Sequence, residues 1–363
     1  GIGRRQRQMC IRDRYYIGHV DWTGFNGLVE YTGSDQFSAV LQFGTSSQTY
    51  QWEGFYTAAP STKSRKITVD GGYIKGGANY RMNENSNIFF NVGQIMRPPS
   101  FDGVFPNADY DFEEADDITN ESFTSFELGY GFISSNFKAN INAYHTVWGD
   151  RTLRRSTSID DQGVRIIYDG VEQTHQGIEA EMTWYPSSRL RIRGMASIGD
   201  WKYSKNFDGD AYFIDNNQPA GTTGTLYLDG VKIGDAAQSV LYLGADYKLS
   251  SKLSMDLDIM SFDNLHGRFG PLDSEFNSAN NRGSIKLPSW GTVDLGATYR
   301  FSLLGYDTTA RLNINNLLDE EYLSQSQTNF HNDGGRTWNG VNVENQVYFG
   351  KGTTWNLGLN IRF

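Results

Sequence analysis

An acidic and aromatic stretch between Phe105 and Asp117 lies in a long connection and supplies candidate ligand-contact residues, among them Asp109, Tyr110 and Asp111. Clustered carboxylates suit hard cations such as Ca²⁺, which take several oxygen ligands, and aromatic rings beside them suit an organic ligand. We therefore expect this stretch to be either a ligand-contacting loop or a solvated acidic loop.

A second acidic group contains Asp208, Asp210 and Asp215, with Tyr212 between them. Its spacing lacks the Asp-x-Asp-x-Asp-Gly pattern of an EF-hand loop, so it is a weaker candidate of the same kind. The other candidates for ligand contact occur at or near predicted loops: Arg97, Phe101, Trp148, Arg151, Arg268, Arg336 and Trp338. The segment 334–338, Gly-Gly-Arg-Thr-Trp, suits an anionic or sugar ligand, with an ordered turn as the alternative.

The five histidines form no His-Glu-x-x-His or other close pair, so the sequence predicts no metal site and no resident cofactor. His266 and His331 fall in predicted loops, where they either contact a haem or ferric ligand or are ordinary surface side chains. Catalysis by a Ser/His/acid arrangement is not expected, because no Gly-x-Ser-x-Gly motif occurs and Ser197 lies in a strand-like stretch with the wrong spacing.

These candidates need a framework that positions them, and segments with a period of two supply it. The final segment alternates apolar residues with polar residues or glycine, and its apolar members are Trp355, Leu357, Leu359, Ile361 and Phe363. An amphipathic strand of this length that ends the chain on an aromatic residue is typical of the closing strand of an outer-membrane barrel. There it also serves as an assembly signal.

Between the alternating segments, short connections and long connections alternate along the chain. The short turns lie near residues 83–85, 134–136, 186–188, 250–251 and 303–305, and the long connections cover roughly 98–121, 150–174, 204–237, 264–288 and 318–352. A transmembrane β-barrel sorts its loops in this way, because its periplasmic turns are short and its extracellular loops are long. A soluble β-sandwich has no reason to do so.

The two faces of each segment differ in a way that fits a barrel wall. Ile178, Ala180 and Met182 alternate with Glu179 and Glu181. Arg or Lys on the lipid face near the membrane midplane costs about 2–4 kcal/mol, whereas a polar lumen tolerates charge. We therefore predict that the apolar face contacts lipid and that the charged face lines the lumen.

Composition supports an all-β chain. The 363 residues include 14% aromatics, 40 Gly and only 8 Pro, with a formal net charge of −10. No stretch approaches the roughly 20 apolar residues of a transmembrane helix. The acidic charge and the lack of a basic stripe argue against nucleic-acid binding. Residues 1–14 are basic and contain the single cysteine, Cys10, and their composition differs from that of the remaining sequence. We expect them to be an artefact or a non-native segment, with a native basic segment as the alternative.

Counting back from Phe363 gives about thirteen strands, the first of which, roughly 14–57, are poorly resolved by the pattern. Single-chain bacterial barrels have an even number of strands. We therefore predict that residues 15–363 are the C-terminal part of a larger barrel.

Four short motifs resemble those of the TonB-dependent receptor family. They are Asn315-Asn316-Leu317-Leu318-Asp319-Glu320-Glu321-Tyr322, the end of the chain from Val347, Arg97-Pro98-Pro99-Ser100-Phe101 with Glu127-Leu128-Gly129, and Gly177-Ile178-Glu179. The resemblance covers roughly residues 70–363, and the segment from Tyr144 to Leu153 is similar to receptors of the Bacteroidota.

The resemblance implies a 22-stranded, plugged barrel in the outer membrane of a Gram-negative bacterium. Such a receptor imports a scarce ligand, namely a ferric siderophore, haem, a vitamin or a glycan. Its implied partners are outer-membrane lipid, the barrel-assembly machinery, TonB-ExbB-ExbD through a plug missing from this chain, and in some members a surface lipoprotein. A passive porin, an outer-membrane enzyme and a soluble β-binding module are the alternatives, in that order.

Overall fold

The computed structural model describes residues 15–55, 63–105, 114–115, 118–159, 162–214, 218–220, 224–270 and 273–362. Four predictions fall outside these ranges. They concern the basic segment 1–14, the acidic loop residues Asp109, Tyr110 and Asp111, Asp215 of the second acidic group, and the terminal Phe363.

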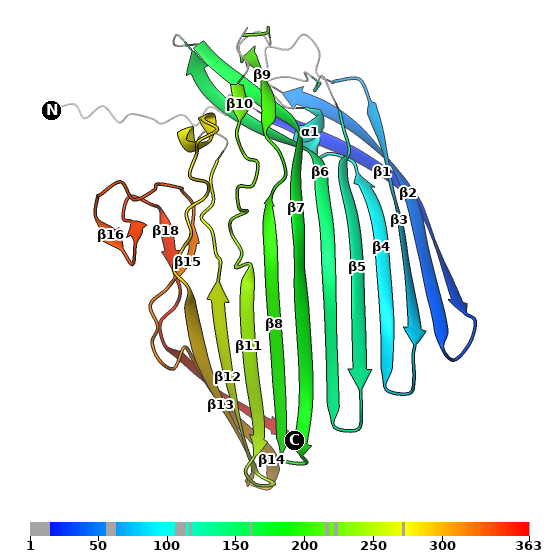
Figure 1. Ribbon diagram of the computed structural model, residues 1–363, viewed down its shortest axis with the longest axis vertical. Helices are drawn as coiled ribbons and strands as arrows, with labels where there is room; N and C mark the ends of the chain where they lie inside the picture. Colours follow the sequence, from blue (N-terminus) through cyan, green and yellow to red (C-terminus); the bar gives the residue numbers. More distant parts are fainter. Residues whose placement is uncertain are drawn as a thin grey trace, which may run out of the picture.

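The chain forms one tall, curved antiparallel sheet whose main path contains thirteen strands, as the alternating pattern predicts (Figure 1). In order, these strands are β1 (Tyr15–Thr32), β2 (Phe37–Phe55), β3 (Ile67–Arg81), β4 (Ser86–Arg97), β5 (Glu121–Ile133), β6 (Phe137–Ile159), β7 (Gln162–Ser187), β8 (Leu190–Tyr203), β11 (Ser239–Lys248), β12 (Leu253–Asp263), β13 (Trp290–Leu303), β14 (Tyr306–Asn315) and β19 (Thr354–Arg362). Among the described residues the outer edges of β1 and β19 have no partner strand, so this sheet is a partial barrel.

The connections are sorted by length as predicted. Every short turn predicted from the sequence lies at one end of the sheet, the lower end in Figure 1, and the long connections lie at the other. We call these the turn end and the loop end. One prediction was wrong, because residues 150–174 are not a long loop. Strands β6 and β7 continue through them as a hairpin, in which alternate residues Val164, Ile166 and Tyr168 are buried against loop side chains.

Small elements cover the loop end. They are α1 (Phe101–Val104), β9 (Phe207–Phe213), β10 (Gly224–Leu226), the 3-10 helix η1 (Ser274–Asn277), β15 (Leu323–Ser326), β16 (Thr337–Trp338), β17 (Val341–Asn342) and β18 (Val347–Phe349). Strand β9 pairs with both β7 and β10, and β15 pairs with β18. No helix in the described part of the chain has the length and apolar character needed to cross a membrane.

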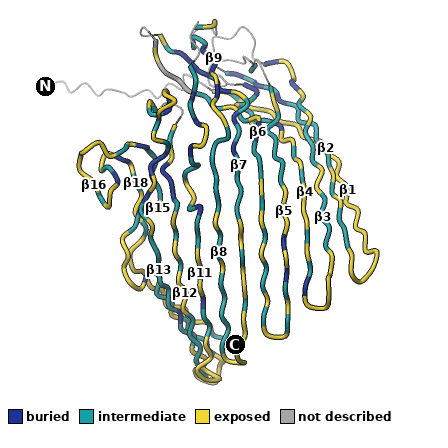
Figure 2. Tube along the Cα trace, in the orientation of Figure 1, coloured by how far each residue is buried: buried dark blue, intermediate teal, exposed yellow. Residues whose placement is uncertain are grey.

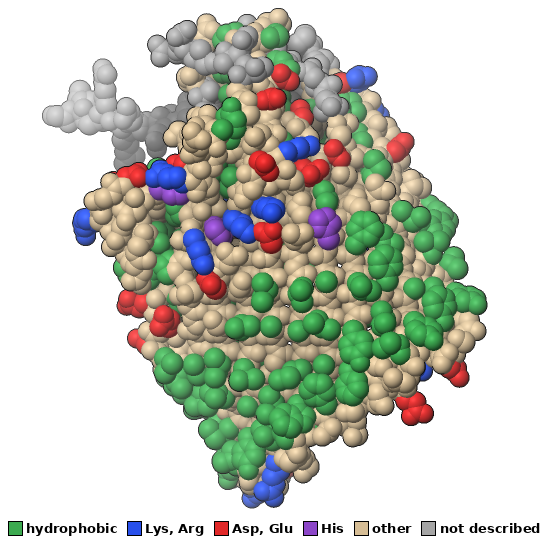
Figure 3. Space-filling view, in the orientation of Figure 1, with side chains coloured by type: hydrophobic (Ala, Val, Ile, Leu, Met, Phe, Trp, Pro, Cys, Tyr) green, Lys and Arg blue, Asp and Glu red, His purple; other side chains and the backbone are tan. Residues whose placement is uncertain are grey.

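The two faces of the sheet differ as the sequence predicts. Apolar side chains such as Ile178 (55% exposed) and Leu243 (49% exposed) point outward. Figure 3 shows hydrophobic side chains gathered in a green band across the lower half of the visible face. The opposite, concave face carries ion pairs between strands, including those of Arg193 with Asp246 and Asp258. A polar inner wall and an apolar outer band are the arrangement of a barrel that faces lipid.

The fully buried apolar residues concentrate at the loop end, where Figure 2 shows most of the dark blue segments. They form three clusters: one between β7, β9, β10 and η1, one around Tyr50, Trp52 and α1, and one around Leu265, Leu287 and Leu323. The connections described at this end are therefore packed structures with cores of their own.

The segment 315–322 forms a hydrogen-bonded turn at the loop end of β14. The Asn316 side chain is 4% exposed and donates to the carbonyl oxygens of Glu320 (3.0 Å) and Lys351 (3.1 Å). Its Oδ1 accepts the Glu320 N–H at 2.9 Å. The Tyr322 ring stacks on Trp290, 3.8 Å between centroids. This segment is thus a structural junction between β13, β14 and the chain leading into β19.

Replacing Asn316 by alanine should destabilise this junction by about 2–4 kcal/mol, because the three hydrogen bonds of this buried side chain are lost at once. Asn316 also has a φ of +51°, a conformation that asparagine tolerates better than alanine. The midpoint of urea unfolding in detergent micelles measures the change. Asn315→Ala is the matched control, because Asn315 is exposed and, among the described residues, its side chain bonds only Thr354.

Candidate functional site

Three of the predicted ligand-contact residues come together on the inner wall near the loop end. Arg97 ends β4, Trp148 lies on β6, and Arg151 follows it after a register shift. Glu121 and Phe123 at the start of β5 complete the group, because β5 places Glu121 opposite Arg97 and Phe123 opposite Trp148. We call these five residues the upper cluster.

The upper cluster combines two cations, one carboxylate and two rings. Phe123 and Trp148 stack with centroids 4.9 Å apart, and the Arg151 guanidinium lies 3.8 Å from the Trp148 ring centroid. Arg97 pairs with Glu121 and lies 5.5 Å from the Phe123 centroid. The Trp148 Nε1 donates to Glu121 at 3.3 Å. Guanidiniums above aromatic faces are held there by about 0.5–2 kcal/mol each.

Arg151 is the unusual member of the cluster. Its side chain is partly buried and forms no ion pair with any described carboxylate, whereas Arg97 is neutralised by Glu121. Its Nε is buried without a hydrogen-bond partner. The cluster therefore carries a net positive charge beside two flat apolar surfaces, which is suitable for contacting an anionic ligand with conjugated groups.

More aromatic side chains continue along the same inner wall. His175 and Trp201 lie opposite each other on β7 and β8, with ring centroids 5.6 Å apart. The Trp201 Nε1 donates to the Tyr144 hydroxyl at 2.8 Å. A role for these residues, and for Glu121 and Phe123, was not predicted from the sequence. Strand phase was the signal available for Phe123 and His175, because each shares the inner face of its strand with a glutamate two or four positions away.

Phe101 lies apart from the upper cluster, on the short helix α1. Its half-buried ring packs against Tyr16 (6.0 Å between centroids) and Phe105 (5.1 Å), and its edge covers Gly18. Arg154 holds the helix by donating to the backbone oxygens of Asp102 and Gly103. Phe101 thus has a packing role in this structure, and ligand contact by its ring stays a prediction.

The candidates on the other loops are dispersed. Asp208 accepts a hydrogen bond from Thr225 at 2.7 Å between β9 and β10, and Tyr212 is half-buried on β9. Arg268 is exposed and lies 3.5 Å from a carboxylate oxygen of Asp235. These residues lie on the loop-end connections and do not join the upper cluster through any contact among the described residues.

The two histidines of the loops are engaged inside the fold. His266 is 8% exposed, and its two ring nitrogens lie 3.2 Å from the Ser284 carbonyl oxygen and 3.1 Å from Asn264 Oδ1. Burial lowers the pKa of His266, so its ring is neutral near pH 7. His331 Nε2 lies 2.9 Å from the Gly283 carbonyl oxygen. The His266 ring is buried, whereas the His331 ring is half-buried with one nitrogen engaged, and ligand contact by either ring stays a prediction.

Arg336 and Trp338 lie in the small β16–β17 hairpin. Trp338 is half-buried and meets Phe349 edge to face, with centroids 5.2 Å apart, whereas Arg336 is exposed. Trp338 thus packs on the third core, and Arg336 is available to solvent. Within the described part of the chain, no group of three or more His, Cys, Asp or Glu side chains is placed to hold a metal ion.

One ion pair links two loops at this end. Arg282 bonds Glu275 on η1 at 2.7 Å and Asp333 on the next loop at 2.6 Å. The Arg282 side chain and backbone lower the pKa of Glu275 from 4.5 to about 2. The next residue, Phe276, is completely buried in the core between β7, β9 and β10.

This pair makes the loop end sensitive to acid. A carboxyl group whose pKa is lowered by folding stabilises the fold above its unfolded value, and that contribution disappears as pH falls from about 4.5 toward 2. Amide hydrogen exchange at residues 273–283, corrected for the intrinsic rate, should accelerate from pH 5 to pH 3. Arg282→Gln should already exchange fast at pH 5. An unchanged profile in that variant would contradict the assignment.

The comparisons with known proteins agree with this architecture. The family model described as TonB dependent receptor-like, beta-barrel matches residues 11–317. A search of curated protein sequences found no match.

Solved structures share the fold at low sequence identity. The siderophore receptor PiuA from Acinetobacter baumannii has a TM-score of 0.69 and 15% identity, over 95% of this chain and 44% of its own. The ferric-catecholate import receptor Fiu from E. coli K12 has a TM-score of 0.61 and 13% identity, over 97% and 46%. The ferric citrate transporter FecA has a TM-score of 0.62 and 11% identity, over 96% and 46%.

The chain thus spans less than half the length of these three structures. The family match covers most of the sequence, and the partial, lipid-facing sheet agrees with it. The chain belongs to the TonB-dependent receptor family, as part of the β-barrel of a Gram-negative outer-membrane protein.

Proposed function

We propose that this chain forms part of an active-transport receptor that binds a scarce extracellular ligand for TonB-energised uptake. The observation that carries the proposal is the upper cluster, which places Arg97, Trp148 and Arg151 together on the inner wall of a barrel of this family. Relatives of similar fold are described as receptors or transporters for siderophores, ferric catecholate, ferric citrate and copper. Among these ligands, anionic ferric chelates suit a cationic, aromatic cluster best.

Several finer parts of the proposal rest on family membership. We infer that energy reaches the barrel from TonB, ExbB and ExbD through a plug domain, and that the barrel-assembly machinery inserts the protein through the closing strand β19. A surface lipoprotein is a further candidate partner. The assignment of residues 1–14 as non-native, the absence of enzymatic activity and an origin in the Bacteroidota remain proposals from the sequence alone.

Uptake by cells that carry the full-length receptor tests the function. Cells expressing it should accumulate radioactive iron supplied as ferric citrate or as a ferric catecholate, and dissipating the proton gradient should abolish accumulation. Accumulation that ignores the gradient would instead favour the passive porin. Failure to accumulate either chelate, with the receptor folded in the outer membrane, would contradict the proposed ligand class.

A further inference from the structure

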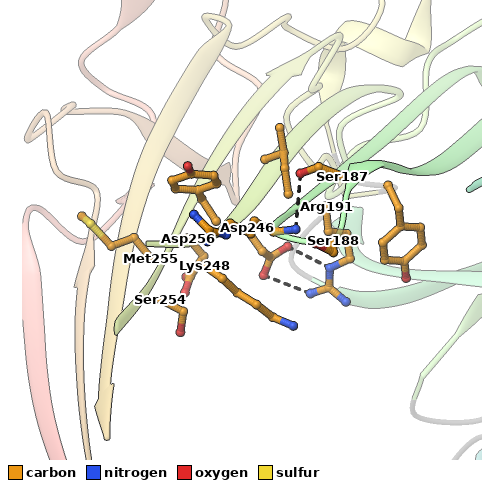
Figure 4. A pocket seen from close by; sticks show the side chains of 12 residues that line it. Ser187, Ser188, Arg191, Asp246, Lys248, Ser254, Met255 and Asp256 are labelled. Atoms are coloured by element: carbon orange, nitrogen blue, oxygen red, sulfur yellow. Dashed lines mark hydrogen bonds and ion pairs between the residues drawn. The ribbon is translucent and has the colours of Figure 1, made fainter. Parts of the chain in front are cut away.

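A second feature of the inner wall lies at the turn end, away from the upper cluster. A pocket of about 570 Å³ opens between the β7–β8 turn, β11 and the start of β12 (Figure 4). Its polar lining consists mainly of hydrogen-bond donors: Tyr185, Ser187, Ser188, Arg189, Arg191, Lys248 and Ser254. We call it the turn-end pocket.

The two carboxylates of the turn-end pocket are already neutralised. Asp246 accepts from Arg191 through both oxygens at 2.9 Å and from Arg193 at 3.1 Å. Asp256 accepts from both terminal nitrogens of Arg311. Paired hydrogen bonds of this kind hold a carboxylate firmly, so neither Asp is free to neutralise a further cation.

Two cations of the turn-end pocket are not paired with either of these carboxylates. Arg189 and Lys248 are exposed and form no ion pair with any described side chain. Their backbones are directly linked, because the Lys248 backbone N–H donates to the Arg189 carbonyl oxygen at 2.9 Å, so both side chains start from neighbouring points of the pocket rim. In Figure 4 the Lys248 side chain extends toward the side on which Arg191 lies, and Met255 points the other way.

The hydroxyl groups add directed donors to this charge. Ser187 Oγ accepts the Arg189 N–H at 3.3 Å, which leaves its own hydrogen free to donate. Ser254 lines the pocket from β12. A local excess of two positive charges in a chain of net charge −10, combined with hydroxyl donors in a concave site, is the chemistry that recognises a tetrahedral or planar oxyanion.

We propose that the turn-end pocket binds a compact oxyanion of the phosphate class through Arg189, Lys248 and the surrounding hydroxyls. The phosphate can come from solution or from a lipid headgroup at the turn end of the barrel. The proposal is independent of the ligand that the upper cluster binds.

The experiment uses the full-length receptor in detergent and compares it with the double variant Arg189→Gln/Lys248→Gln. Inorganic phosphate is the first probe, with binding followed by ³¹P NMR line broadening. The double variant should bind at least about tenfold more weakly, the equivalent of roughly 1.4 kcal/mol. Lys252→Gln is the matched control, because this exposed lysine lies in the adjacent turn but does not line the pocket.

The second probe separates the two sources of phosphate. Receptor from nanodiscs of phosphatidylglycerol is examined by native mass spectrometry for retained lipid. Loss of retained lipid in the double variant supports the proposal with a headgroup as the source, and loss of free phosphate binding supports it with a soluble anion. If the folded double variant equals the control with both probes, the proposal is overturned.

Discussion

Replacing Ile141 by arginine should destabilise the barrel by about 2–4 kcal/mol, whereas the same replacement at the next residue, Asn142, should cost far less. Ile141 points outward and is 47% exposed in the apolar band, opposite Tyr130 on β5 and Ala180 on β7. Arginine there places a charge in hydrocarbon, where neither water nor a carboxylate solvates it.

Asn142 is the matched position because it shares the strand and the depth but faces the lumen. Its cross-strand neighbour on β7 is Glu179, and a new guanidinium beside that carboxylate gains an opposite charge. Urea unfolding of the full-length receptor in lipid vesicles measures both variants, and heat-modifiable migration on gels reports folding. Equal losses at the two positions would contradict the assignment of the faces.

The strands were predictable from the sequence because their signal is local. Alternation is visible within a single strand, and short turns such as Ser134-Ser135-Asn136 carry residues that favour turns. The first two strands were the hardest to recognise, because β1 places apolar side chains such as Val20, Trp22 and Val29 on both of its faces. Antiparallel pairing with β2 along its full length defines β1 in the structure.

The β6–β7 hairpin shows where local reasoning fails. The sequence pattern assigned residues 150–174 to a loop, because a strand that continues beyond the membrane no longer alternates against lipid. Instead, Val164 and Tyr168 alternate against a core supplied by distant residues such as Phe207 and Phe276. Contacts between segments so far apart in the chain cannot be inferred from the period of either one.

The candidate site was predictable only in part, for a related reason. Arg97, Trp148 and Arg151 could be selected as residue types, but only strand register shows that they meet. Phe123 stacks on Trp148, and Glu121 bonds both Arg97 and Trp148, so these two residues hold the cluster together. In the sequence, each looks like an ordinary strand residue. The burial of His266 could not be predicted either, because its loop folds into a core made by residues that are distant in the sequence.

Replacing Arg151 by glutamine should weaken the binding of an anionic ferric chelate about 10–100-fold, because a charged hydrogen bond contributes about 1.5–3 kcal/mol. Arg151 is the cation that no described carboxylate neutralises, and it lies against the Trp148 ring. Arg151→Lys should recover only part of the affinity, since an ammonium group cannot stack as a planar guanidinium does.

The neighbouring carboxylate supplies a variant with the opposite expected sign. Glu121→Gln removes the only carboxylate of the upper cluster, so it should strengthen the binding of the same anionic chelate. Arg81→Gln is the control, because Arg81 ends β3 at the turn end, at the opposite end of the wall. Quenching of tryptophan fluorescence by ferric citrate and by a ferric catecholate measures affinity in the full-length receptor.

These outcomes separate a ligand-binding role for the upper cluster from a structural one. If Arg151 only stabilised the hairpin, Arg151→Gln would lower the unfolding midpoint and Glu121→Gln would not raise affinity. Opposite shifts in affinity at unchanged unfolding midpoints require that the bound ligand experience the charge of the cluster directly. The same pair of variants should leave the affinity for a neutral ligand such as cyanocobalamin unchanged, because a neutral molecule gains nothing from net charge at the wall.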